Sequence, residues 1–122
     1  MLSKSEEKIM NILWKHKGAF MKDILNALPE PKPAKTTVST LLKRMTEKEM
    51  ISYEKIGNSR KYTPTVAKKN YFSERFDEFK KSFFNSSSTQ FASFFTKDTD
   101  LSISELEEIQ KLIGEEIKKK KS

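Results

Sequence analysis

The side chains that could do chemistry in this sequence are few, and most of them suit binding rather than catalysis. The 122 residues include one histidine, His16, and no cysteine. A nucleophile–base pair or a metal site, which needs several nitrogen, sulfur or oxygen ligands, therefore has few possible components. Adjacent carboxylates such as Glu6 and Glu7 point to different sides of a helix and do not converge on a pocket. The sequence argues against an enzyme and indicates no cofactor and no metal.

Hydroxyl and cationic side chains are instead concentrated between residues 35 and 44. Apolar residues recur in this region at i, i+3, i+4 and i+7, and they are Val38, Leu41, Leu42 and Met45. This spacing predicts a helix over about residues 35–49 that buries one face. Its opposite face would present short hydroxyls, lysines and an arginine, which bind phosphates and base edges in a DNA major groove. The candidate DNA-binding residues of this helix are Lys35, Thr36, Thr37, Ser39, Thr40, Lys43 and Arg44.

Two interpretations of this helix stay open when it is taken alone. An ordinary amphipathic helix in solvent has the same pattern of polar and apolar residues. Glu47, on the predicted outward face, could accept a hydrogen bond from cytosine or repel a phosphate. The neighbouring segments favour the nucleic-acid interpretation.

A basic β-hairpin is predicted directly after this helix. Residues 51–56 and 60–64 contain strand-forming side chains such as Tyr53 and Tyr62, and Gly57-Asn58 supplies the positive φ angles of a tight reversal. Cations surround the tip of the hairpin at Lys55, Arg60 and Lys61, where they could straddle a phosphate backbone or a minor groove. The candidate DNA-binding residues of the hairpin are Asn58, Ser59, Arg60 and Lys61.

Two further helices are predicted before the helix at residues 35–49. The first begins with a capping box formed by Ser3 and Glu6, and it ends near Gly18. The second covers residues 21–28 and is terminated by the prolines at positions 29, 31 and 33. Three helices followed by a basic hairpin form a winged helix-turn-helix. The predicted fold class is mainly α with a small β-hairpin wing.

Apolar stripes dominate the second part of the chain. Phenylalanines spaced 4, 3 and 4 residues apart predict a helix over about residues 66–85 with a coiled-coil-like seam. A serine-rich break leads into a short second helix, and Ser102 with Glu105 forms a capping box for a third. Such helices are best covered by a second copy of the chain, although they could instead fold back on the winged helix. The candidate dimerisation residues are Phe72, Phe76, Phe79, Phe83, Phe91, Phe94, Phe95, Leu106, Ile109, Ile113 and Ile117.

The distribution of charge supports a division of the chain near residue 65. Residues 1–65 hold 13 Lys and Arg against 7 Asp and Glu, whereas residues 66–122 hold 11 against 10. A basic first part and a nearly neutral second part indicate that only the first part meets a polyanion. We therefore predict a winged-helix DNA-binding domain over residues 1–65 and a helical dimerisation domain over residues 66–122.

Composition also bears on location. No apolar run approaches the length needed to cross a bilayer, so no membrane partner is expected. Residues 1–4 lack the basic-then-apolar layout of a secretory signal. The absence of cysteine gives no sign of an oxidising compartment, and a cytoplasmic location is expected.

The sequence resembles the penicillinase repressor (BlaI/MecI) family over nearly its whole length. The resemblance lies in Leu2-Ser3, Glu6 and Ile12-Leu13-Trp14, in the run from Thr36 to Met45 followed by Lys48, and in Gly57 to Arg60 with Tyr62-Thr63-Pro64. It implies a homodimeric bacterial repressor that binds a palindromic operator on double-stranded DNA. In that family, residues of the recognition helix and the wing touch the DNA, and a helical C-terminal region joins the subunits.

Three positions depart from the family pattern. Ala34 stands where a capping serine is usual. The helix predicted at residues 35–49 could therefore begin at Thr36 or use the Thr36 hydroxyl as its cap. Glu49 stands where glycine is usual, which predicts strain at Glu49 or a different helix end. Phe94-Phe95 stands where β-lactam-inducible members are cut between Asn and Phe. This difference argues against induction by proteolysis, but cleavage at Phe94-Phe95 or at another site stays an open alternative, and an upstream sensor protease stays unknown.

Two alternative functions stay open at this point. The winged helix could serve only as a protein-interaction module. It could also belong to a regulator that senses a small molecule in the cleft between its domains.

Overall fold

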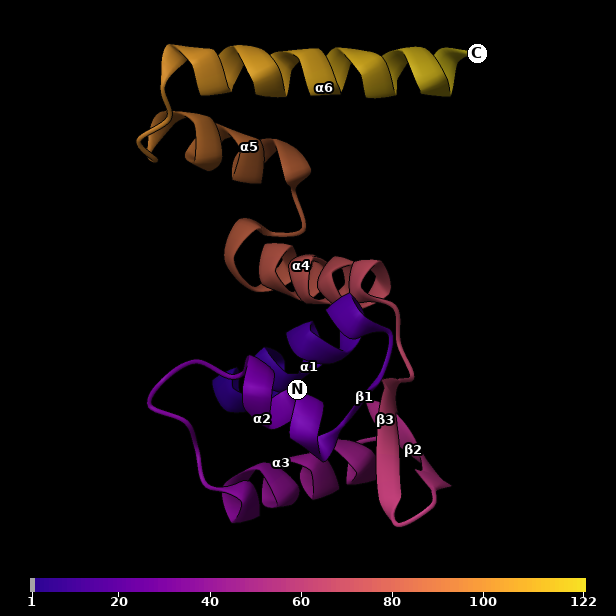
Figure 1. The fold of residues 1–122 in the computed structure, drawn as a ribbon. Coiled ribbons are helices and arrows are strands. Elements are labelled where there is room, and N and C mark those ends of the chain that lie inside the picture. Colours follow the sequence, from indigo (N-terminus) through magenta and orange to yellow (C-terminus); the bar gives the residue numbers. More distant parts are fainter. Residues whose placement is uncertain (1) are drawn as a thin grey trace. The chain divides into compact units, whose positions relative to one another are not determined.

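The computed structural model describes residues 2–122, which form six helices and three short strands (Figure 1). In chain order these are α1 (Lys4–His16), β1 (Ala19–Phe20), α2 (Met21–Ala27), α3 (Lys35–Glu47), β2 (Ile51–Ile56), β3 (Ser59–Pro64), α4 (Lys68–Phe84), α5 (Ser88–Lys97) and α6 (Ile103–Lys121). The chain divides into two compact units, one ending at Ser73 and the other running from Glu74 to Ser122. The predicted fold class, mainly α with a small β-hairpin wing, is confirmed.

Helix α1 begins at a capping box and ends at a residue with a left-handed backbone conformation. The Ser3 Oγ accepts a hydrogen bond from the Glu6 N–H at 3.2 Å, and the Ser3 N–H donates to Glu6 Oε1 at 2.8 Å. This predicted capping box satisfies two amides that the helix itself leaves without a partner. The helix ends at His16, because Lys17 takes a left-handed φ of 55°.

The core of the first unit lies between α1, α2, α3 and the sheet. Val38, Leu42 and Met45 of α3 are fully buried, as their helical spacing predicts. They belong to one cluster with the buried residues of α1 and α2 and with Ile51 of β2. Full burial of one such side chain contributes about 1.5–3 kcal/mol. This cluster therefore determines which face of α3 turns inward.

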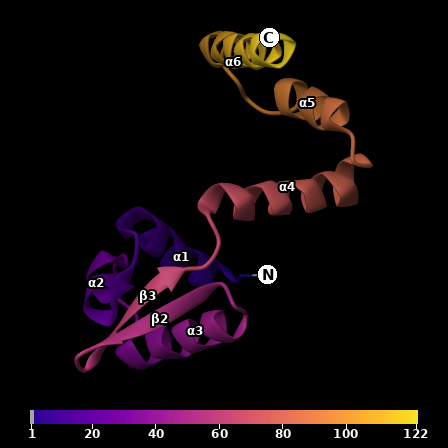
Figure 2. The ribbon, with the colours of Figure 1, turned by 90° about the vertical axis from the view of Figure 1, so that its right-hand side faces the viewer.

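A three-stranded antiparallel sheet completes the first unit, with strand order β1-β3-β2 (Figure 1). Figure 2 shows β2 and β3 side by side. Strands β2 and β3 form the predicted hairpin, and their pairing runs from Ile51↔Pro64 to the turn. The sequence does not predict β1, which pairs with β3 through Ala19 and Tyr62, because two residues are too few for a periodic pattern. This pairing attaches the wing to the segment between α1 and α2.

The hairpin turn differs from the predicted one at Asn58. Gly57 has a φ of 63°, whereas Asn58 is not among the positive-φ residues of the described chain. A positive φ at the first central position alone is the pattern of a type II′ turn, which matches the right-handed twist of paired strands. The prediction that both residues supply positive φ angles is therefore wrong for Asn58.

Helix α3 ends at Glu47, earlier than the predicted end at residue 49. Glu49 follows with a left-handed φ of 61°. Its N–H donates to the Thr46 carbonyl at 3.0 Å, and the Met50 N–H donates to the Met45 carbonyl at 3.0 Å. These two bonds form a Schellman motif, which usually has glycine at the left-handed position. Glu49 occupies that position at a steric cost of about 1–2 kcal/mol.

The first turns of α4 belong to the first unit. Trp14 Nε1 donates to the Val66 carbonyl at 2.8 Å, and Tyr71 is only 4% exposed. The Trp14 ring also contacts Tyr71 and Phe72, with centroid distances of 5.7 and 5.9 Å. The division between the units therefore falls after Ser73, inside α4, whereas the sequence predicts a boundary at residue 65.

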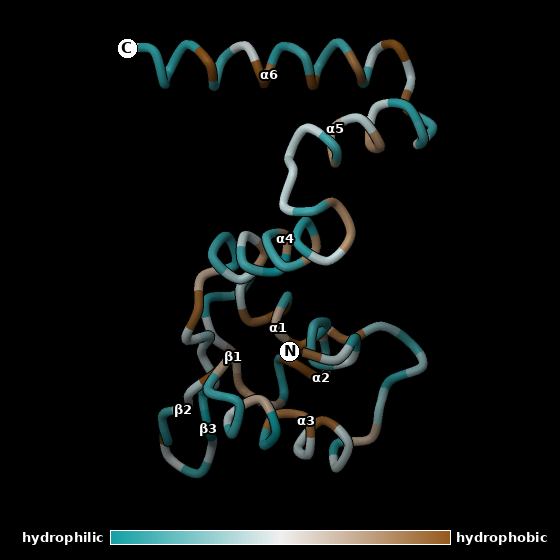
Figure 3. Tube along the Cα trace, turned by 180° about the vertical axis from the view of Figure 1, so that it is seen from behind, coloured by the Kyte–Doolittle hydropathy of each residue, from teal (hydrophilic) through white to brown (hydrophobic). Residues whose placement is uncertain are grey.

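The second unit contains the rest of α4 together with α5 and α6. Ser87 caps α5, and Ser102 with Glu105 forms the predicted capping box of α6. No residue from 74 to 122 is fully buried. Figure 3 shows apolar positions recurring along α6 between polar ones. Among the helices that the structure describes, none combines the length and the apolar composition that spanning a membrane requires.

Candidate nucleic-acid interface

The outward face of α3 is built from the hydroxyl and cationic residues predicted for it. The burial of Val38, Leu42 and Met45 turns the opposite side of the helix to solvent. All predicted site residues of α3 are exposed, and they are Lys35, Thr36, Thr37, Ser39, Thr40, Lys43 and Arg44. Glu47, the last residue of the helix, is exposed as well. The helix offers these groups to a partner without any change in its own packing.

The first turn of α3 leaves backbone donors available. Ala34 is the N-cap residue, and its side chain makes no hydrogen bond to the helix. The helix begins at Lys35 rather than Thr36, and the Val38 N–H donates to the Ala34 carbonyl at 3.2 Å. The amides before Val38 lack an intrahelical acceptor and form the positive end of the helix dipole, which favours a nearby anion.

The Thr40 hydroxyl is oriented by the backbone. Its Oγ1 donates to the Thr36 carbonyl oxygen at 3.0 Å. The hydroxyl hydrogen is therefore used within the helix, and the oxygen of this exposed side chain stays available as an acceptor. A hydroxyl oxygen can accept from a base amino group, and a methyl group can contact the methyl of thymine.

Arg60 lies against an aromatic ring of the wing. Its guanidinium carbon is 4.3 Å from the centroid of the Tyr53 ring. Tyr53 pairs with Tyr62 across the hairpin, with ring centroids 5.7 Å apart. A cation on an exposed aromatic face gains about 0.5–1 kcal/mol. This contact limits the positions that the Arg60 guanidinium can take.

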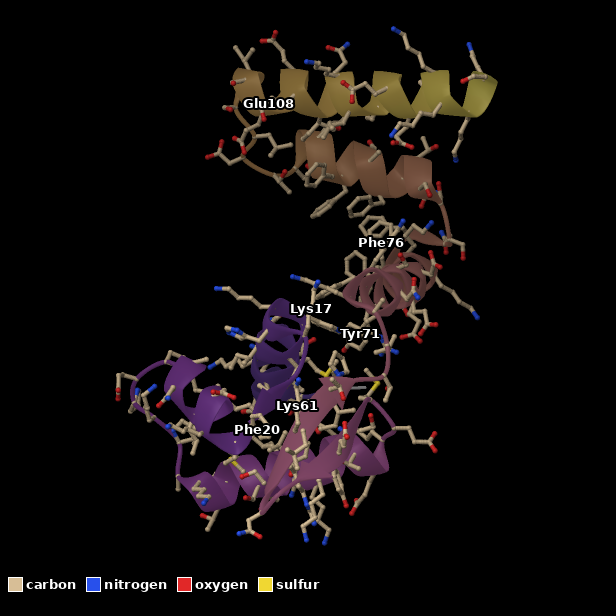
Figure 4. The ribbon with its side chains drawn as sticks, turned by 45° about the vertical axis from the view of Figure 1, so that its right-hand side comes forward. Lys17, Phe20, Lys61, Tyr71, Phe76 and Glu108 are labelled. Carbon is tan, nitrogen blue, oxygen red and sulfur yellow. The ribbon has the colours of Figure 1, made fainter. Side chains whose placement is uncertain are left out.

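Lys61 lies on the other face of the hairpin, because successive residues of a strand point to opposite sides. Lys61 is labelled in Figure 4. It pairs across the strands with Glu54 and is half-buried. The Lys61 side chain lies close to Gly18: a larger residue at position 18 would place its Cβ only 3.2 Å from the Lys61 Cε. The structure thus separates Lys61 from Arg60, although the sequence predicts the two as neighbours at one surface.

Two open hollows meet at Arg60. The first, which we call the wing–α3 groove, has a volume of about 360 Å³ and is lined by Ser39, Lys43, Thr46, Glu47, Tyr53 and Arg60. The second, which we call the α2–wing hollow, has a volume of about 490 Å³ and includes Lys22, Asn26, Lys35, Asn58, Ser59 and Arg60. Thr37 lies apart from both, in a hollow with Pro29 and Pro31. The structure therefore brings most predicted wing residues next to α3 but does not gather every predicted residue of α3.

Lys22 and Asn26 are missing from the residues predicted for this surface. They stand four positions apart on α2, and both are exposed. The buried residue of that helix, Ile24, lies on its opposite side. The helical spacing of Lys22 and Asn26, opposite the apolar Ile24, could have predicted that both side chains face solvent. Nothing in the sequence places them beside the wing.

The cations of this surface are available to a ligand. Among the residues that the structure describes, no ion pair involves Lys22, Lys35, Lys43, Arg44 or Arg60. Their charges are therefore balanced by solvent ions in the free protein, and these ions can be released when a polyanion binds.

The predicted dimerisation residues fall in both units. Phe72 belongs to the first unit, where it contacts Trp14. The other phenylalanines form an aromatic cluster in the second unit, in which Phe76 and Phe91 meet edge to face at 4.8 Å. On α6, Leu106 and Ile109 are half-buried, whereas Ile113 is 56% exposed. Neither unit buries these residues completely.

The fold and this surface define a winged helix-turn-helix protein, with α3 as the recognition helix and β2–β3 as the wing. The sequence profile of the family described as "Penicillinase repressor" matches residues 2–115. The chain is 24% identical over 121 residues to the penicillinase repressor of Bacillus licheniformis, an alignment that covers 98% of this chain and 94% of that protein.

Two solved repressor structures match a little over half of the chain. The solution structure of the DNA-binding domain of the repressor BlaI is 25% identical, with a TM-score of 0.52 and coverage of 58% of this chain and 88% of that chain. The structure of the CopR repressor is 34% identical, with a TM-score of 0.47 and coverage of 54% and 97%. The chain belongs to the penicillinase repressor family, and the predicted resemblance is confirmed. It is a DNA-binding transcriptional repressor of the winged-helix class.

Proposed function

We propose that this repressor acts as a homodimer on a palindromic operator in double-stranded DNA. Helix α3 of each subunit enters a major groove, and the wing holds the adjacent sugar–phosphate backbone. The exposed polar face of α3, opposite the buried Val38, Leu42 and Met45, is the observation that supports this most directly. Because a repressor of this kind acts on accessible DNA, a cytoplasmic location is part of the proposal.

The residues of the interface have different roles in this proposal. Base edges are read by side chains near the middle of the outward face, and they are Thr36, Ser39, Thr40, Lys43 and Arg44. Lys35 and Thr37, at the start of the helix, meet phosphates, which the free amides of the first turn also favour. The wing residues Asn58, Ser59 and Arg60 hold the backbone and determine the register of the protein on the duplex. Lys61, on the other face of the hairpin, adds positive charge near the same backbone.

The second unit provides the contact between subunits in this proposal. Phe83, Ile113 and Ile117 are 74%, 56% and 49% exposed, although large apolar side chains are usually buried in a lone domain. A second copy of the same surface would cover them in a two-fold symmetric contact. Such a pair suits the function, because recognition helices about 34 Å apart reach successive major grooves on one side of the duplex.

Selection of bound fragments from a random DNA pool tests the operator symmetry. The proposal predicts a motif with inverted repeats whose half-sites are about one helical turn, or a multiple of it, apart. Analytical ultracentrifugation of the complex is expected to give two chains per duplex. A motif without inverted symmetry, or a complex with one chain, would contradict the proposal.

Salt titration separates this proposal from a winged helix that binds only proteins. Neutralised phosphates make the logarithm of the affinity fall linearly with the logarithm of the salt concentration, with a slope of about −0.9 for each phosphate contacted. We expect a steep slope with the selected duplex. Absent or salt-independent binding would favour a protein partner.

A further inference from the structure

The two hollows beside Arg60 differ in the charges that line them. The wing–α3 groove combines Lys43 and Arg60 with the carboxylate of Glu47. The α2–wing hollow has Lys22, Lys35 and Arg60 along its lining and no carboxylate. The first therefore offers both charged donors and a charged acceptor, whereas the second offers only positive charge.

The positive charge of the α2–wing hollow is not neutralised from nearby elements. Asp23 is the acidic residue of α2, but its Oδ2 accepts a hydrogen bond from the Phe20 N–H at 3.0 Å. Asp23 lines a different hollow, together with His16. Like charges gathered in one hollow repel each other, and an oxyanion relieves that repulsion while accepting hydrogen bonds from each cation.

The three cations come from three separate elements of the first unit. Lys22 lies on α2, Lys35 is the first residue of α3, and Arg60 lies on β3 beside the wing turn. The free amides of the first turn of α3 add to the positive potential at Lys35. Cations from three elements surround the hollow, so they fix the position of a bound anion more closely than a single surface lysine would.

We propose that the α2–wing hollow is a phosphate-binding site and that Lys22 is a DNA contact contributed by α2. The inference rests on the proposed DNA binding. The same hollow is also lined by Met21 and Leu25, which give an apolar surface against which a deoxyribose ring can pack. This mixture of cations and apolar side chains favours a sugar–phosphate backbone over a bare inorganic anion.

The wing–α3 groove takes a different part of the duplex in this arrangement. Glu47 would repel a phosphate there, but its carboxylate can accept a hydrogen bond from the amino group of cytosine. Arg60 lines both hollows and therefore stands between the phosphate side and the base side of the interface.

Salt titration of DNA binding by the full chain tests the role of Lys22, with a short duplex of mixed sequence as the probe. Loss of one phosphate contact lowers the salt slope by about one. Lys22→Ala is expected to lower the slope by that amount and to weaken binding about three- to tenfold at moderate salt. Lys22→Arg should keep the slope of the unmodified protein. Lys15→Ala is the matched control, because Lys15 is an exposed lysine of α1 outside the hollow.

Titration with pyrophosphate identifies the source of the phosphate group. If the amide signals around Lys22 and Lys35 in NMR spectra shift and saturate, and pyrophosphate competes with the duplex, the hollow also accepts free anions. If they do not shift while the Lys22→Ala slope falls, the DNA backbone is its ligand. Equal slopes for Lys22→Ala and Lys15→Ala, without pyrophosphate binding, would overturn the inference. Failure of the unmodified protein to bind any duplex would instead contradict the proposed function.

Discussion

The Nζ of Lys48 lies 2.8 Å from Oε1 of Glu6, and this ion pair joins the residue that caps the end of α3 to the first turn of α1. Glu6 is 2% exposed, and the Ser3 N–H donates to the same oxygen at 2.8 Å. Burial raises the pKa of the Glu6 carboxyl, but the hydrogen bonds from Lys48 and Ser3 outweigh burial and hold this pKa below its ordinary value. The pair therefore helps to hold the recognition helix against α1.

We expect the free energy of unfolding to fall as Glu6 becomes protonated. Because its pKa is lower in the folded than in the unfolded state, the contribution is complete above the ordinary glutamate pKa of about 4.3. It is lost as the pH falls through the lower folded-state value. Glu6→Gln removes the charge-assisted hydrogen bond to Lys48 and should cost about 1.5–3 kcal/mol of unfolding free energy at neutral pH, and less in acid. Urea unfolding at several pH values measures the difference.

Glu7→Gln is the control for this prediction, since Glu7 makes no ion pair among the described residues. It should leave both the stability and its pH dependence nearly unchanged. A Glu6→Gln deficit that stays constant from neutral to acidic pH would show that the charge of Glu6 does not matter.

Glu49→Gly is expected to stabilise the protein. The left-handed φ of 61° at Glu49 suits glycine, and the Schellman hydrogen bonds involve only backbone atoms. Relief of strain, less the greater flexibility of glycine in the unfolded chain, should add about 0.5–1 kcal/mol. The control Lys43→Gly lies at an exposed position inside the helix and should destabilise by about 1 kcal/mol. Thermal unfolding measures both, and a lower melting temperature for Glu49→Gly would contradict the expectation.

Replacement of Arg60 should weaken binding to all DNA sequences alike. Arg60→Ala removes the proposed backbone contact and is expected to lower the salt slope by about one. Tyr53→Leu removes the ring beneath the guanidinium and should produce a smaller loss in the same direction. Fluorescence anisotropy with specific and mixed-sequence duplexes at several salt concentrations measures these effects. A loss confined to the specific duplex would mean that Arg60 reads bases instead.

Replacement of Lys43 should change the preference among sequences. Lys43 is exposed in the wing–α3 groove, where a lysine can donate to the acceptors of guanine. Lys43→Ala is expected to reduce discrimination at one position of each half-site by about 1–3 kcal/mol. Competition among single-base variants of the selected operator measures this change. Equal losses on every variant would show that Lys43 only contacts the backbone.

A charge placed on the apolar face of α6 should separate the subunits. Ile113→Glu puts a carboxylate among Leu106, Ile109 and Ile117, which lie on the same side of the helix. The control Lys111→Glu introduces a carboxylate on the opposite side. Sedimentation is expected to give a monomer for Ile113→Glu and a dimer for Lys111→Glu. Dimers from both variants would remove α6 from the proposed interface.

The elements with local signals could be predicted from the sequence. The inward face of α3 follows from the helical spacing of Val38, Leu42 and Met45, and the start of α1 follows from the Ser3–Glu6 capping box. The hairpin follows from strand-forming residues around Gly57. Each of these patterns lies within a few consecutive turns or strands, so the energies that determine it come from near neighbours in the chain.

The features that depend on distant residues could not be predicted. The hydrogen bond from Trp14 to Val66, which adds the start of α4 to the first unit, joins residues 52 positions apart. The approach of Lys22 to Arg60 depends on the packing of α2 beside the wing, and the two-residue β1 exists only because β3 pairs with it. Tertiary packing rather than local propensity determines these arrangements, so no periodic pattern in the sequence predicts them.

We propose that the outward face of α3 and the wing meet the DNA. Amide NMR of the full chain, titrated with the duplex selected from the random pool, locates this contact residue by residue. We predict the largest shifts at Thr36, Ser39 and Thr40 and at residues 58–60, with little change on α6. Shifts confined to α4–α6, with α3 and the wing unperturbed at saturation, would show that another surface binds the duplex.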